Sequence, residues 1–218
     1  MKIIGSINEK GGVGKTTIIV NVCGDLASRG YKVALVDAEP QESATQIAQS
    51  EKLNYKVLAW GERDYENVEV LQEVKRSIKA LEKDFDFVGI DTEPGFHGSA
   101  VLAAALSDLT IIPIGASSLD VWATTRTIDF IHSAQEDQGG NPLVLIVPNR
   151  IQPNTIMSRD LLSMLPEYGK VSEPVYLRVE LAEAATAGQW VGDYAPKGKG
   201  KEEINKVTDS ILGEISND

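Results

Sequence analysis

The stretch Lys10-Gly11-Gly12-Val13-Gly14-Lys15-Thr16-Thr17 follows directly on the apolar run Ile3-Ile4-Gly5-Ser6-Ile7. An apolar strand, a glycine-rich loop and a Lys-Thr pair in this order are typical of a loop that binds phosphate groups at the start of a helix. The loop is a variant of that pattern, because its glycines are Gly11, Gly12 and Gly14 and a further lysine, Lys10, stands at its beginning.

Each part of this loop has a physical reason. Glycine lets the backbone take positive φ, so several consecutive N–H groups can turn toward one anion. The helix that begins near Lys15 adds the positive end of its dipole at the same place. We expect Lys15 to reach the β- and γ-phosphates and the Thr16 hydroxyl to ligate Mg²⁺. The alternative is a glycine-rich turn that binds nothing, and the ordered arrival of strand, loop, Lys-Thr-Thr and helix argues against it.

The bulk composition predicts one domain spanning residues 1–218, with 42% hydrophobic and 24% charged residues, as in ordinary globular proteins. No apolar run approaches the ~20 residues of a membrane span, and the N-terminus lacks a signal-peptide pattern, so we expect a cytoplasmic protein. The single cysteine, Cys23, excludes an internal disulfide and suits a reducing cytosol. The net charge of −11 argues against a whole-surface affinity for nucleic acid but allows a local basic patch.

Apolar runs alternate with helical patterns along the whole chain. This alternation predicts an α/β fold with a mostly parallel, twisted sheet and helices on both faces. The predicted strands are 2–7, 33–36, 55–60, 85–91, 109–114, 143–147 and 171–175. The predicted helices are 15–28, 41–50, 67–83, 119–135, 154–165, 181–187 and 202–215, with an irregular loop over 192–200.

Two of the predicted strands end in acidic residues. Asp37 and Glu39 follow the strand 33–36, and Asp91 ends the strand 85–91. The carboxyl ends of parallel strands are where ligand sites form in open α/β sheets, and an aspartate at such an end holds Mg²⁺ in phosphate-loop NTPases. The turn Thr92-Glu93-Pro94-Gly95 then suits a switch loop that senses the γ-phosphate. An Asp91 that only caps the next helix is the alternative.

Together these motifs resemble the ParA/MinD family of ATPases with a deviant Walker A motif. The resemblance runs nearly from end to end and is strongest to short ParA-type plasmid partition proteins similar to ParF, which carry no helix-turn-helix module. The segments that carry it are Lys10–Thr17, Asp37–Gln41, Phe87–Pro94, Asp108–Ile114, Asn149-Arg150, Leu181–Gly188 and Tyr194–Lys197.

The resemblance implies roles for individual residues in binding ATP and Mg²⁺. It implies that Lys15 and the loop Gly11-Gly12-Val13-Gly14 hold the phosphates, with Thr17 at the α-phosphate. Thr16, Asp37 and Asp91 would form the Mg²⁺ shell, and Asn149 with Arg150 would contact adenine. The family's signature lysine matches Lys10, which would neutralise charge on the nucleotide of a partner subunit and so couple catalysis to a homodimer.

The sequence departs from the family pattern at two positions. The family usually has Asp where this chain has Glu39, at the place where a carboxylate orients the attacking water. Glu is one methylene longer, and a misplacement of about 1 Å can cost roughly 10²-fold in rate, so we expect slow but surviving turnover. Glu93 stands where the family often has Pro, which changes the switch loop.

The resemblance implies a partition ATPase whose ATP-bound dimer binds DNA nonspecifically and is released when a centromere-binding or adaptor protein stimulates hydrolysis. Candidate DNA contacts are Arg178, the run Lys197-Gly-Lys199-Gly-Lys201 and Lys170, although solvated loop lysines would look the same. The same switch could instead position a carboxysome or another cytoplasmic body. A MinD-like membrane cycle would need a basic amphipathic C-terminal helix, and the acidic tail argues against it. An iron–sulfur reductase is excluded because one cysteine cannot ligate a cluster. A small-molecule kinase or synthetase of the same fold would need a substrate motif, and the chain offers none.

Overall fold

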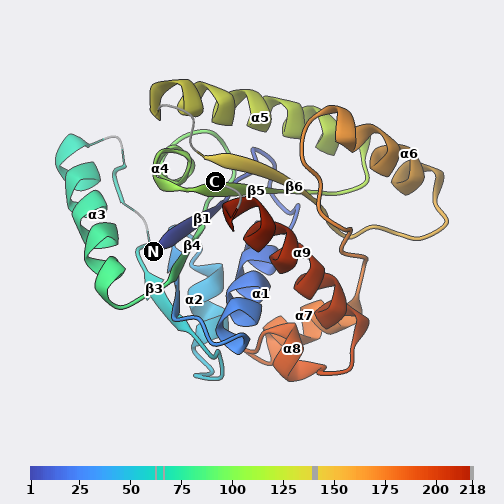
Figure 1. Cartoon of the computed structure of the whole chain (residues 1–218), viewed down its shortest axis with the longest axis horizontal. Helices are drawn as coiled ribbons and strands as arrows, with labels where there is room; N and C mark the ends of the chain where they lie inside the picture. Colours follow the sequence, from blue (N-terminus) through green and yellow to red (C-terminus); the bar gives the residue numbers. More distant parts are fainter. Residues whose placement is uncertain (62, 66, 139–141, 217–218) are drawn as a thin grey trace.

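The computed structural model describes residues 1–61, 63–65, 67–138 and 142–216, and it contains one six-stranded sheet (Figure 1). The strand order is β3-β2-β4-β1-β5-β6, and every pair of neighbours is parallel. The strands are β1 (Lys2–Ser6), β2 (Val33–Asp37), β3 (Lys56–Ala59), β4 (Phe87–Asp91), β5 (Leu109–Ile114) and β6 (Leu143–Pro148).

Helices cover both faces of this sheet. They are α1 (Lys15–Ser28), α2 (Ser43–Ala48), α3 (Val68–Ala80), α4 (Ser99–Leu106), α5 (Ser118–Gln138), α6 (Ile156–Met164), α7 (Val179–Thr186), α8 (Val191–Tyr194) and α9 (Lys199–Ser216), with 3₁₀ turns at Leu81–Lys83 and Leu165–Glu167. In Figure 1, α1 and α9 lie together on one face, and α4 and α5 cover the other. The central strands β2, β4 and β5 are buried throughout, as continuous apolar runs predict.

Two predicted segments were wrong. Residues 171–175 form no strand in the described chain, where this region makes only isolated bridges, Ile146 with Val171 and Ile151 with Tyr176. Pro174 has no N–H to donate, so a regular ladder cannot continue through it. Residues 192–200 are not an irregular loop, because α8 occupies their start and α9 begins at Lys199. The Glu180 carboxylate accepts the Gly200 N–H, which satisfies a donor in the first turn of α9.

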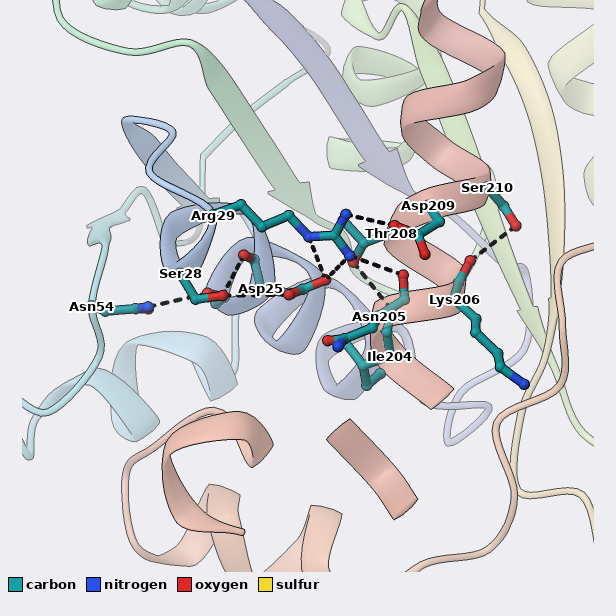
Figure 2. A network of polar contacts seen from close by, with 11 residues as sticks. Asp25, Ser28, Arg29, Asn54, Ile204, Asn205, Lys206, Thr208, Asp209 and Ser210 are labelled. Atoms are coloured by element: carbon teal, nitrogen blue, oxygen red, sulfur yellow. Dashed lines mark hydrogen bonds and ion pairs between the residues drawn. The ribbon is translucent and has the colours of Figure 1, made fainter. Parts of the chain in front are cut away.

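Helix α9 is fastened to α1, the helix that follows the phosphate loop, by a group of polar contacts (Figure 2). Arg29 donates to Asp25 through Nε and Nη2 (3.1 and 2.7 Å) and to Asp209 through Nη1 (2.5 Å). It also donates to the Asn205 carbonyl at 3.1 Å. The Asn205 side-chain nitrogen, turned toward α1, donates to Asp25 Oδ1 at 3.1 Å. We call Asp25, Arg29, Asn205 and Asp209 the α1–α9 clasp.

The apolar side of α9 faces the core. Ile204, Val207 and Ile211 are fully buried in the same cluster as Trp190 and the apolar side chains of α1. Among the described residues no helix has the length and apolar character needed to cross a membrane.

Candidate functional site

The glycine-rich loop between β1 and α1 has the backbone that its sequence predicts. Gly12 has φ 75° and Gly14, which caps α1, has φ 99°, and both values lie in the left-handed region that favours glycine. A Cβ added to Gly14 would also collide with the side-chain amide of Asn149. The first turn of α1, Lys15–Thr17, therefore opens directly onto the loop with N–H groups that have no partner inside the helix.

Lys15 is held inside the loop by the chain's own carbonyl groups. The residue is 6% exposed, and its Nζ donates to Asn8 O at 3.3 Å and to Lys10 O at 3.2 Å. Burial lowers the pKa of Lys15, while the Asp91 and Glu39 carboxylates raise it. Both hydrogen bonds are long for N–H···O contacts, so an anion at the loop would offer the ammonium stronger acceptors. Lys15 therefore fits a phosphate group.

Asn8 and Glu9, which belong to no recognisable motif, hold the start of the phosphate loop in place. Asn8 is fully buried, donates to Pro113 O at 2.9 Å and accepts Lys10 N at 2.9 Å. Glu9 donates its N–H to Thr127 Oγ1 at 3.2 Å and forms an ion pair with Arg126 at 2.7 Å. Helix α5 is thus connected to the start of the loop. Sequence reasoning missed these residues, and a buried asparagine at a strand end was the one signal available.

Asn149 and Arg150, directly after β6, contact the phosphate loop at the same carboxyl-end edge of the parallel sheet. Asn149 is 1% exposed and its amide donates to Val13 O at 2.8 Å. Arg150 donates from Nη1 to Gly12 O at 2.8 Å. The structure thus brings both residues to the loop and gives them a supporting contact there. Beside them lies a cavity of about 310 Å³, lined by residues 10–13, 115–117, Arg150, Gln152, Thr155, Met157 and Ser158. Contact with adenine stays a prediction.

The sheet register brings the acidic residues together. Asp37 lies opposite Asp91 in the β2–β4 pair, and Asp91 lies opposite Ser6 in the β1–β4 pair. Asp37 accepts Glu39 N on Oδ1 at 3.3 Å and Thr45 N on Oδ2 at 2.7 Å. The Asp37 carboxylate therefore fixes the turn that carries Glu39 and the first residues of α2.

Asp91 is the least satisfied acidic group of the site. It is fully buried, and neither carboxylate oxygen makes a hydrogen bond of normal geometry with a described residue. Burial raises the pKa of Asp91 to about 8; the nearby Thr16 hydroxyl and Lys15 oppose this, and Asp37 and Glu39 add to it. A divalent cation with water in its shell would supply the missing partners, so Thr16 and Asp91 fit Mg²⁺.

The described residues hold no cluster of three or more His, Cys, Asp or Glu side chains that could bind a metal ion alone. Glu39 also carries a buried oxygen without a partner, Oε2, on the same side of the sheet.

Glu93, which departs from the family pattern, has a structural task. Its N–H donates to Ser99 Oγ at 3.1 Å, and Ser99 N donates back to Glu93 Oε1 at 3.3 Å. This reciprocal pair closes the loop 93–99 at the start of α4. Thr92 holds the beginning of the same loop by donating to Ser6 O at 2.7 Å.

Comparison with known proteins decides the family. The sequence profile described as the CobQ/CobB/MinD/ParA nucleotide binding domain matches residues 4–191. The chain belongs to this family. One relative, the maintenance of carboxysome distribution protein A of Halothiobacillus neapolitanus, is 28% identical over 214 residues, with 94% of each chain covered. The sporulation initiation inhibitor protein Soj of Bacillus subtilis is 26% identical over 239 residues, covering 92% of this chain and 94% of Soj.

A solved structure supports the same fold. The Cyanothece McdA(D38A)–ATP complex superimposes with a TM-score of 0.79 at 19% identity, covering 98% of this chain and 96% of that one. The predictions of a ParA-type family member and of a mostly parallel α/β phosphate-loop fold are thus confirmed. The roles given to single residues stay predictions.

Proposed function

We propose that this chain is a Mg²⁺-dependent ATPase that acts as a partition or positioning switch. The observation that carries the proposal is the buried Asp91 carboxylate, which makes no hydrogen bond of normal geometry with a described residue and lies beside Thr16, Lys15 and a phosphate loop of suitable backbone. A buried carboxylate in that state is costly unless a ligand completes it.

Different residues of the site are proposed to bind the phosphates, hold the metal ion and orient the attacking water. Lys15 and the N–H groups of the first turn of α1 bind and orient the phosphates, and Thr16 and Asp91 hold Mg²⁺, which when bound withdraws charge from the phosphate oxygens. Asp37 keeps the Glu39 turn in place through two backbone hydrogen bonds. Glu39 Oε2 is then available to accept a hydrogen bond from the attacking water and to orient it for an in-line displacement.

Lys10 makes the switch depend on a second copy of the chain. It lies at the rim of the 310 Å³ cavity and is half-buried there. A lysine at that rim can reach a nucleotide held by a facing subunit, where its positive charge would stabilise the charge that develops during phosphoryl transfer. Lys10→Ala should therefore abolish ATP-dependent dimerisation and partner-stimulated turnover. A Lys10→Ala protein that dimerises and hydrolyses ATP normally would remove this role.

The ATP-bound dimer is proposed to bind DNA nonspecifically. The basic residues that could contact DNA differ in whether they are already paired with a carboxylate. Arg178 donates from Nε and Nη2 to Glu203 Oε1 (3.1 and 2.7 Å), and Lys170 is paired with Glu214 at 3.0 Å. Lys197 and Lys199 are exposed, which makes them the better candidates. With a net charge of −11, binding should be modest and strongly salt-dependent.

The name of one relative supports a second kind of cargo. A relative with 28% identity is named for the maintenance of carboxysome distribution, so a cytoplasmic body handled through an adaptor protein is the alternative to plasmid DNA. A MinD-like membrane cycle is disfavoured, because the apolar side chains of α9 are already packed against α1.

The test is ATP hydrolysis by the wild type, Lys15→Ala and Glu39→Gln, followed by DNA binding with ATP, with ADP and without nucleotide over a salt series. The wild type should hydrolyse ATP slowly. Lys15→Ala should bind ATP about 100-fold more weakly, since a charge-assisted contact is lost. Glu39→Gln should bind ATP normally but lose turnover. Absence of hydrolysis in the wild type, or unchanged turnover in Glu39→Gln, would contradict the catalytic part. Absence of ATP-dependent binding at low salt would contradict the DNA part.

A further inference from the structure

Tyr65 lies between β3 and α3, in a segment that carries no motif, yet it presents a hydroxyl group without a partner. The residue is 7% exposed, and its Oη is a buried atom with no hydrogen-bond partner among the described residues. An unsatisfied buried hydroxyl costs about 1–3 kcal/mol, and a phenylalanine would fill the same space without that cost. We therefore expect the hydroxyl group to make a hydrogen bond in another state of the protein.

The segment that carries Tyr65 is fixed to the acidic end of the sheet. Trp60 N and Gly61 N both donate to Asp37 O, at 2.9 and 3.4 Å. Arg63 donates from Nε to Trp60 O at 3.1 Å, and its guanidinium lies over the Trp60 ring at 5.4 Å. Tyr65 N in turn donates to Arg63 O at 3.0 Å. Tyr65 is thus connected through Arg63 and Trp60 to Asp37, the residue that positions Glu39.

The Tyr65 ring packs on the loop that follows Asp91. A Cβ built on Gly98 would lie 3.6 Å from Tyr65 Cδ2 and would collide with Glu93 Oε1. Gly98 has φ 52°, which favours glycine, and it lies close to both the tyrosine ring and the Glu93 carboxylate. Burial raises the pKa of Tyr65 to about 12, Arg63 lowers it, and Glu93 and Asp37 raise it further. The phenol therefore remains a proton donor at neutral pH and lies within the field of both carboxylates.

We propose that Tyr65 is a positioning residue for hydrolysis, whose hydroxyl donates a hydrogen bond to Glu93 when the chain holds Mg²⁺ and ATP. In the structure Glu93 Oε1 accepts Ser99 N, while Tyr65 Oη has no partner among the described residues. The new hydrogen bond would hold the loop 93–98 against the segment pinned to Asp37, and so fix Asp91 and Glu39 relative to each other. The proposal rests on the ATPase function proposed above.

A role limited to packing makes different predictions. If Tyr65 serves only as a core ring, Tyr65→Phe keeps every apolar contact and turnover does not change. If its hydroxyl positions the loop, Tyr65→Phe lowers kcat about tenfold, the value of one lost hydrogen bond in the reacting complex, and leaves KM for ATP within about twofold. In both cases the ligand-free Tyr65→Phe protein unfolds at a higher temperature, because the unsatisfied hydroxyl is gone.

The experiment compares steady-state ATP hydrolysis of the wild type, Tyr65→Phe, Glu93→Gln and the double variant, with Tyr31→Phe as the matched control. Tyr31 contacts Phe87 edge-on near the opposite ends of the strands, and it is 39% exposed, so its variant should turn over ATP like the wild type. We expect the double variant to be no slower than the slower single variant, because Tyr65→Phe removes the donor of the same hydrogen bond whose acceptor Glu93→Gln deprives of its charge. A wild-type kcat for Tyr65→Phe, or fully additive losses in the double variant, would overturn the proposal.

A second measurement does not depend on hydrolysis. Hydrogen exchange of the amides in 93–98 is followed with and without a non-hydrolysable ATP analogue and Mg²⁺. The wild type should gain protection on binding, and Tyr65→Phe should gain about tenfold less. Equal protection in both proteins would overturn the role of Tyr65. If the wild type binds the analogue and gains this protection but never hydrolyses ATP, the proposed ATPase function fails, while the contact of Tyr65 with the loop 93–98 on nucleotide binding stands.

Discussion

Two buried acidic groups of this protein, Asp25 and Asp91, lie at similar depth and have opposite surroundings. Asp25 is 2% exposed and receives hydrogen bonds from Arg29 (Figure 2) and, with the Asn205 amide nitrogen turned toward α1, from Asn205. Asp91 is fully buried and has no such partner among the described residues. Buried polar groups in native proteins are nearly always paired. A satisfied carboxylate thus indicates a structural contact, and an unsatisfied one indicates the place of a ligand.

Of the ten buried side-chain atoms without a partner among the described residues, five lie at one end of the sheet. Glu39 Oε2, Thr45 Oγ1, Tyr65 Oη and both oxygens of Asp91 belong to segments at or after the ends of β2, β3 and β4. Isolated atoms without partners, such as Trp190 Nε1, also occur elsewhere in the described chain. This end of the sheet differs because it holds a whole carboxylate without a partner. We call Glu39, Thr45, Tyr65 and Asp91 the catalytic edge.

The largest expected effect comes from removing the charge of each buried carboxylate. The folded pKa of Asp91 is about 8 and the unfolded value about 3.9. The native state therefore binds more protons than the unfolded state between these values, and Asp91 makes stability fall as pH rises from about 4 to 8. Asp91→Asn should raise the free energy of unfolding of the ligand-free chain, on the order of 3 kcal/mol at pH 7. The matched change Asp25→Asn should lower it.

Urea unfolding of the wild type and both variants from pH 5 to pH 8 checks this prediction. The difference between Asp91→Asn and the wild type should grow with pH, by up to about 1.4 kcal/mol per pH unit. Parallel curves for Asp91→Asn and the wild type, or stabilisation by Asp25→Asn, would remove the contrast between the two carboxylates.

Breaking the clasp from its basic side should have the next largest effect. Arg29→Met keeps most of the side-chain volume but leaves Asp25 buried with fewer partners. We expect a loss of about 2 kcal/mol, which is less than for a fully buried pair because the guanidinium is partly exposed. Arg76→Met on the exposed face of α3 is the control and should change stability by less than about 0.5 kcal/mol. A loss no greater than that of the control would show that the clasp contributes little.

The smallest effect compares one hydroxyl group from each region. Thr45 Oγ1 has no partner at the catalytic edge, whereas Thr208, beside Asp209 on α9, donates to Ile204 O at 3.1 Å. Thr45→Val should stabilise the ligand-free chain by about 0.5–1 kcal/mol, and Thr208→Val should destabilise it by about 1 kcal/mol. Thermal unfolding of the two variants measures both changes. Changes of the same sign would mean that the partner, or its absence, does not decide the cost of these hydroxyl groups.

The sequence predicted what local patterns determine. The loop Lys10–Thr17, the strand ends at Asp37 and Asp91 and the alternation of strands and helices all follow from short motifs and periodicity. The strand 109–114 was placed at the observed residues, and the first helix at Lys15–Ser28. Residues that act through distant contacts were not predictable in this way. Asn8 meets Pro113 and Tyr65 meets Gly98 only after the chain has folded.

The predicted DNA contacts also depended on tertiary contacts that the sequence does not reveal. Arg178 reads as a free cation in the sequence, but Glu203 is 25 residues away in the chain and directly bonded to it in the fold. The segment around Pro174 reads as apolar and extended, yet it lacks the donor that a strand needs at that position. A contact between distant residues decided the first case, and a missing backbone donor decided the second.

The central claim is that the catalytic edge is completed by Mg²⁺ with a nucleotide, and thermal unfolding of the wild type and Asp91→Asn tests it most directly. Each protein is measured alone, with ATP and EDTA, and with ATP and Mg²⁺. A ligand at 100 times its Kd contributes about 2.7 kcal/mol, which corresponds to about 5–10 °C for a chain of this size. We predict that Mg²⁺ raises the ATP-dependent shift in Tm of the wild type and adds nothing in Asp91→Asn. No effect of Mg²⁺ on the wild type, or an equal effect on both proteins, would contradict the account.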